Sequence, residues 1–142
     1  MPPPVPPAGP STAVPALSTG TLIASTVWRL LIVVCAFTGY SAALDRGGGD
    51  VLDTTLPLSQ LASLVTGVCY AGLVVAGLVA GPRRPEPPSA WLRGLLTVTL
   101  MLVSVVFLTM MSGDLSETWS LFEHLLTPLA VVVDWLAFGR RQ

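Results

Sequence analysis

Four long apolar segments dominate this chain, and short polar stretches separate them. The segments cover residues 21–44, 57–81, 89–112 and 117–139. Each is close to the roughly 20 residues that a helix needs to cross the hydrocarbon core of a bilayer. In lipid only helices and closed barrels satisfy the backbone, and these segments are too long and too continuous for barrel strands. The pattern therefore predicts an all-α bundle of four transmembrane helices.

A soluble helical bundle is the alternative, and the distribution of charge argues against it. Residues 64–80 and 95–111 carry no charged side chain, so neither segment has a polar face for water. Only 11% of the residues are charged, against about 25% in a typical soluble domain. The mean hydropathy is +0.74. Lipid is therefore the expected solvent, and the bilayer the main partner.

The polar stretches predict the ends of the molecule and its orientation. Residues 1–20 contain seven prolines and no charge, which predicts a disordered tail before a transmembrane domain at 21–142. Five arginines fall on one side of the predicted membrane and one on the other. The positive-inside rule then predicts both termini in the cytoplasm. The five are Arg83, Arg84, Arg93, Arg140 and Arg141, and the single one is Arg46.

Composition also limits the partners and cofactors. The net charge of −1 offers no basic patch, which argues against nucleic acid. No Cys/His spacing predicts a metal or a haem, and no cofactor is expected. Gly77 and Gly81 form a GxxxG pattern in the second segment, which favours close helix packing inside the bundle, in a homo-oligomer or against a membrane partner. Chance placement in a Gly/Ala-rich chain is the alternative.

Two charged residues lie inside the apolar segments at matching depth. With a rise of about 1.5 Å per residue, Arg29 sits on the order of 10 Å from the cytoplasmic end of its helix and Asp134 roughly 8 Å from the same side. We expect an intramembrane ion pair between the first and last helices. The alternative is that each side chain reaches the interface separately, which Arg does readily and Asp does poorly.

His124 and Ser59 are the candidate catalytic residues. Both fall near the outer ends of helices that enter from the same side, and a hydroxyl beside a histidine is the minimum for an activated nucleophile. The alternative is structural: His124 hydrogen-bonds a neighbouring helix, and Ser59 merely begins one. Pro128 is expected to kink the fourth helix, because it has no N–H for the carbonyl of His124.

The spacing His124-x3-Pro128-x5-Asp134-Trp135 resembles the hallmark of the Pr-six-Pr family of bacterial multi-pass membrane proteins. Trp28-Arg29 and the stretch around Tyr70 are similar to that family too. The family is distantly similar to the androgen-induced and androgen-dependent membrane proteins of animals. Those proteins hydrolyse branched fatty-acid esters with an intramembrane threonine and a histidine.

The resemblance implies a serine/threonine-type lipid esterase in the bacterial inner (plasma) membrane, acting on a lipid-like substrate. His124 matches the family histidine, and Ser59 falls where the threonine nucleophile is expected, with Thr54 and Thr55 as fallback nucleophiles. The asparagine that follows the threonine in the family is missing here. Family members have six helices, so the resemblance also implies a truncated member.

Two functions of different classes remain open. One is a lipid (fatty-acid ester) hydrolase, and the other is a non-catalytic membrane scaffold or partner subunit. A small transporter is less favoured, because the two charges identified at depth lie at one level and no pair of broken helices marks a site at the middle of the membrane.

Overall fold

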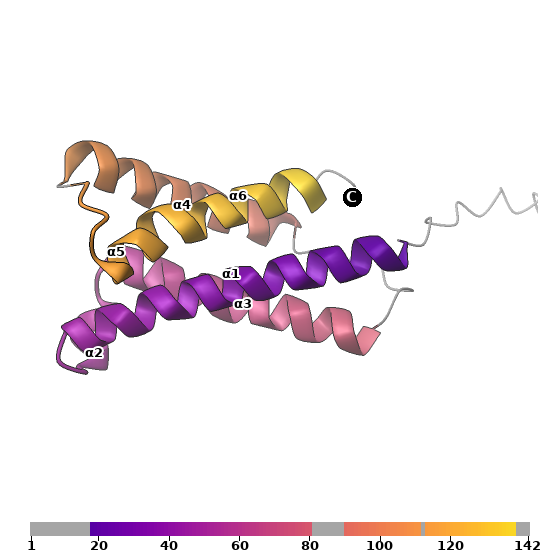
Figure 1. Ribbon diagram of the computed structural model, residues 1–142, viewed down its shortest axis with the longest axis horizontal. Helices are drawn as coiled ribbons and strands as arrows, with labels where there is room; N and C mark the ends of the chain where they lie inside the picture. The colour runs from indigo at the N-terminus through magenta and orange to yellow at the C-terminus, as the bar shows by residue number, and fades with distance from the viewer. Residues whose placement is uncertain (1–17, 81–89, 112, 139–142) are drawn as a thin grey trace, which may run out of the picture.

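The computed structural model describes residues 18–80, 90–111 and 113–138. Helices α1 (Thr19–Arg46), α3 (Leu58–Ala80) and α4 (Ala90–Met110) are followed by a last segment of three consecutive pieces. These pieces are α5 (Thr118–Leu121), the π-helical turn η2 (Phe122–Leu126) and α6 (Thr127–Phe138). The short α2 (Val51–Thr55) connects α1 to α3. Figure 1 shows the long helices side by side, with α2 and α5 at the same end of the bundle, the α2 end.

Four helices are long and apolar enough to cross a membrane: Thr19–Arg46, Leu58–Val79, Trp91–Met110 and Thr118–Phe138. The described part of the chain contains no strand. The prediction of an all-α, membrane-embedded bundle is therefore confirmed, with helix ends that differ from the expected ones by no more than two residues. The predicted tail lies almost wholly outside the described residues, as do Gly81 and the arginines at 83, 84, 140 and 141.

Side chains that accept backbone hydrogen bonds set where two helices begin. Ser18 caps α1 and accepts from the Thr21 N–H at 3.2 Å. Asp50 caps α2 and accepts from the N–H groups of Leu52 (2.9 Å) and Asp53 (3.2 Å). Such caps satisfy N–H groups that have no partner within the helix. The connection between α1 and α3 is therefore partly helical.

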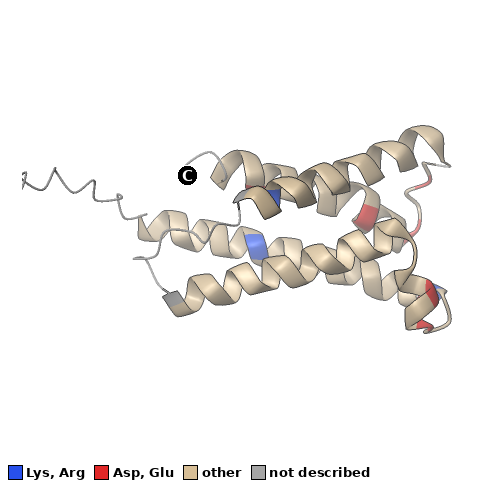
Figure 2. Ribbon diagram, turned by 180° about the vertical axis from the view of Figure 1, so that it is seen from behind, with Lys and Arg blue, Asp and Glu red and all other residues tan. Residues whose placement is uncertain are grey.

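The bundle presents apolar side chains outward and encloses polar ones. Valines and leucines cover the lipid-facing surfaces, for example Val68, Val98 and Leu78, which are 57%, 68% and 70% exposed. The buried centre combines an apolar cluster with many polar side chains. Figure 2 shows few charged residues along the helices and a gathering of acidic residues at the α2 end.

Two glycines allow α1 to approach its neighbours closely. A Cβ on Gly67 would lie 3.1 Å from the Phe37 ring of α1. A Cβ on Gly39 would lie 2.8 Å from Cγ of Glu123 in η2 and 3.1 Å from Cβ of Phe122. Small residues at such contacts let membrane helices pack tightly. Among the glycines inside the described long helices, Gly39 and Gly67 are therefore the sites of close packing.

Gly77 makes no close contact within the described residues. A Cβ on Gly77 would have no atom of these residues within 4 Å. α3 meets α1 nearer the α2 end, at Gly67. Contact of Gly77 with another chain stays a prediction, and Gly81 lies outside the described residues.

Candidate functional site

The last segment is irregular where it carries the candidate histidine. The π-helical turn Phe122–Leu126 directly precedes Thr127-Pro128. Pro128 has no N–H for the carbonyl of His124, and Ser104 of α4 donates to that carbonyl instead, at 2.5 Å. The irregularity expected at Pro128 thus takes the form of a π turn immediately before it. Such turns are frequent at functional sites.

Asp134 is at the centre of a buried polar cluster to which each of the four long segments contributes one side chain. Nε of Arg29 (α1) lies 3.6 Å from Oδ1 of Asp134 (α6). Nη1 of Arg93 (α4) lies 3.3 Å from Oδ2, and the Tyr70 hydroxyl (α3) donates to Oδ2 at 3.2 Å. All four side chains are buried. The structure therefore brings together the predicted pair, Arg29 and Asp134.

Arg93 and Tyr70 were not foreseen in this cluster. The sequence predicts Arg93 among the arginines on the cytoplasmic side, yet its side chain is only 1% exposed. The depth of Arg93 in the membrane was the available signal, because Arg93 and Asp134 lie about equally far from the cytoplasmic ends of their segments. Depth does not show toward which neighbour a helix turns a given side chain, so the sequence could not identify Arg93 as a partner of Asp134. This cluster joins helices and contains no nucleophile.

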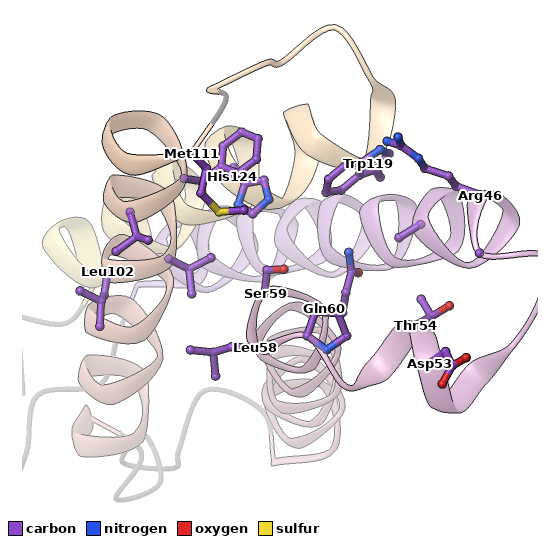
Figure 3. A pocket seen from close by; sticks show the side chains of 16 residues that line it. Arg46, Asp53, Thr54, Leu58, Ser59, Gln60, Leu102, Met111, Trp119 and His124 are labelled. Carbon is purple, nitrogen blue, oxygen red and sulfur yellow. The ribbon is translucent and has the colours of Figure 1, made fainter.

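A cavity of about 730 Å³ lies at the α2 end. Figure 3 shows the side chains around it, which come from α1, α2, α3, α4 and the last segment. One part of its wall is apolar and includes Leu58, Leu102, Val103, Val106, Phe107 and Met111. The other part is polar and includes Arg46, Asp53, Thr54, Ser59, Gln60 and His124. The cavity is thus mostly apolar with a few polar groups at its wall, and it is large enough for a small ligand or part of a lipid.

His124 is held in this wall by aromatic contacts. Its ring stacks on Phe107 with centroids 3.7 Å apart and an interplanar angle of 6°. Trp119 meets it edge-on at 5.8 Å and 76°. Nδ1 is buried and has no hydrogen-bond partner among the described residues. The imidazole is therefore fixed by packing on the cavity wall, without a carboxylate to orient it.

Ser59 lies near the start of α3, is half-buried and lines the same cavity. Figure 3 shows its hydroxyl, the Gln60 amide and the His124 ring around one space. The structure records no hydrogen bond between Ser59 and His124 within the described residues. Of the fallback nucleophiles, Thr54 lines the cavity. Thr55 instead donates to the Val51 carbonyl at 2.6 Å.

Glu123 was not singled out from the sequence, and the structure buries it. Its side chain is 1% exposed and packs against Gly39 of α1. It points away from His124, as expected for adjacent helical residues, but toward the interior and not toward lipid. Its position in an apolar run was the available signal. Groups of three or more His, Cys, Asp or Glu side chains that could hold a metal are absent from the described residues.

Comparisons with known proteins add no relative: no family model, no curated protein and no solved structure matches this chain. The resemblance to the Pr-six-Pr family therefore stays a prediction.

Proposed function

We propose that this protein is an intramembrane lipid-ester hydrolase that works in the cavity at the α2 end. The observation that carries the proposal is that Ser59 and His124, far apart in the sequence, line one mostly apolar cavity. An apolar wall from α4 suits an acyl chain, and the polar wall suits an ester group. The bacterial inner membrane and the orientation with both termini in the cytoplasm belong to the same proposal. They rest on the family resemblance and on the arginines.

The proposed chemistry is acyl transfer in two steps. The Ser59 oxygen attacks the ester carbonyl carbon while His124 takes the hydroxyl proton, and His124 then returns that proton to the leaving alcohol. Water, deprotonated by His124, then attacks the acyl-serine and releases a fatty acid and free Ser59. Catalytic hydrogen bonds are often long before substrate binds, so contact between Ser59 and His124 is expected to form in the substrate complex.

A fluorophosphonate probe tests for the activated serine. We expect the detergent-purified protein to be labelled, and Ser59→Ala and His124→Ala to lose the label, because one removes the nucleophile and the other its base. Ser41→Ala is the matched control, since Ser41 is an exposed serine of α1. Absence of labelling in a folded wild type, or unchanged labelling in Ser59→Ala, would contradict the proposal.

The second candidate is a non-catalytic scaffold or partner subunit. It is favoured by the Asp134 cluster, which joins four segments without a nucleophile, and by the absence of a third group to orient His124. On this account the exposed small-residue face at Gly77 contacts a second copy or a membrane partner. The hydrolase requires Ser59 for its activity. The scaffold does not require Ser59, and depends instead on the packing contacts through which it assembles.

A further inference from the structure

A second group of polar side chains is buried in the bundle, between the cavity and the Asp134 cluster. Glu123 of η2 and Gln60 of α3 are 1% and 6% exposed. Ser63, one turn after Gln60, and Thr127, one turn after Glu123, are fully buried. None of the four takes part in the proposed hydrolysis. Gln60 also lines the cavity, so the group can be reached from it.

The register of α3 and the last segment places these side chains on facing sides. The side-chain amide of Gln60 lies close to the Glu123 carboxyl, without a well-formed hydrogen bond between them. Ten residues further along α3, the Tyr70 hydroxyl bonds Asp134 of α6. Both segments run away from the α2 end (Figure 1), so Ser63 and Thr127 follow at the next level between these two contacts. Four oxygen-bearing side chains therefore line one interior seam.

The oxygens of this group lack hydrogen-bond partners within the described residues. They are Oε1 of Gln60, Oγ of Ser63, Oγ1 of Thr127 and both carboxylate oxygens of Glu123. Elsewhere in the bundle, hydroxyls donate to the carbonyl one turn earlier, as Thr97 does to Arg93 at 2.7 Å. Ser63 and Thr127 make no such bond. Buried polar atoms without partners are destabilising, so a ligand that meets several of them would stabilise the fold.

The charge of Glu123 indicates what that ligand is. The ion pairs of the described interior go to Asp134, and Glu123 forms none with a described arginine. An ionised carboxylate at membrane depth is stabilised by a positive charge nearby, and without one it takes up a proton. A proton would satisfy one oxygen, whereas a coordinated cation would satisfy the whole set. Because Glu123 is the one acidic side chain of this group, a monovalent cation would balance its charge.

We propose that Glu123, Gln60, Ser63 and Thr127 form an intramembrane binding site for an alkali cation, with Na⁺ as its ligand. Gly39 makes room for the Glu123 side chain, since a Cβ there would lie 2.8 Å from Cγ of Glu123. The π-helical turn that carries Glu123 is a further irregularity of the kind found at functional sites. The cation would enter from the α2 end through the cavity, past Gln60.

Thermal unfolding of the full chain in detergent tests the site. We compare NaCl with N-methyl-D-glucamine chloride at the same ionic strength and pH 8. Saturating Na⁺ is expected to raise Tm by roughly 5 °C or more, because it binds the folded state alone. Glu123→Gln, which removes the charge and keeps the shape, should lose this response. Ser63→Ala should keep the response but need several-fold more Na⁺.

Two control variants separate this proposal from others. Glu117→Gln removes an exposed carboxylate of the same segment and should keep the full response to Na⁺. Ser59→Ala should keep it too, so failure of the hydrolase proposal does not affect this result. The same Tm for the wild type in both salts, or a response retained by Glu123→Gln, would overturn the cation site.

Discussion

Some polar side chains inside the bundle bind one another across helices, and others face a cavity or the interior without such partners. Asp134 has Arg93, Arg29 and Tyr70 around it and serves to hold helices together. His124 and Glu123 are adjacent in sequence but face different surroundings, one a cavity and the other the interior seam. Two adjacent residues can therefore have different proposed roles, His124 in ester hydrolysis and Glu123 in Na⁺ binding.

The Asp134 cluster gives a direct prediction about stability. Asp134→Ala should lower the free energy of unfolding by about 3–5 kcal/mol, because it leaves arginine charges buried beside an empty position. Arg93→Ala should cost more than Arg29→Ala, since Arg93 makes the shorter contact and is the more buried. The measurement is denaturation in detergent, with Glu117→Gln as an exposed control.

The Arg29–Asp134 pair can be tested further with a double variant. Because the two side chains interact, Arg29→Ala combined with Asp134→Ala should destabilise by less than the sum of the single changes. Strict additivity would show that the two charges act independently and would contradict the ion pair.

At the element scale, α1 packs against α3 and the last segment, and Gly39 sets its distance from the π-helical turn. Gly39→Ala would place a Cβ 2.8 Å from the Glu123 side chain. Overpacking of this kind should cost about 1–3 kcal/mol of stability and should also weaken the Na⁺ response. Gly72→Ala is the matched control, because a Cβ there meets no described atom within 4 Å. Equal loss of stability in both variants would contradict the close contact.

The helices themselves could be predicted because length and apolarity alone decide them in lipid. α2 escaped prediction because five residues behind an Asp50 cap form no recognisable period. The π-helical turn also escaped, since it depends on how Ser104 of a neighbouring helix meets the carbonyl that Pro128 leaves without a donor. The sequence gives the depth of Arg29 and Asp134 in the membrane. It does not give the rotation of a helix about its axis when that helix is apolar on all sides, and for that reason it does not identify the roles of Arg93 and Glu123.

At the scale of the whole molecule, the bundle is an apolar shell around a polar interior. The cavity opens this interior at the α2 end, and the Asp134 cluster joins the helices deeper in the bundle. Ser59 and His124 lie at the wall of that cavity, and His124 also packs against Phe107 and Trp119. Ser59→Ala should therefore affect activity much more than folding, whereas His124→Ala should lower both activity and Tm.

Ester hydrolysis by the purified protein in lipid vesicles tests whether Ser59 and His124 form the active site of a lipid-ester hydrolase. We would measure fatty acid released from a long-chain fatty-acid ester by the wild type, Ser59→Ala and His124→Ala, with folding checked by Tm. We expect the wild type to release fatty acid, and the rate of release to fall by roughly 10²-fold or more in both variants while each remains folded. No release by a folded wild type, or equal release by all three proteins, would contradict it.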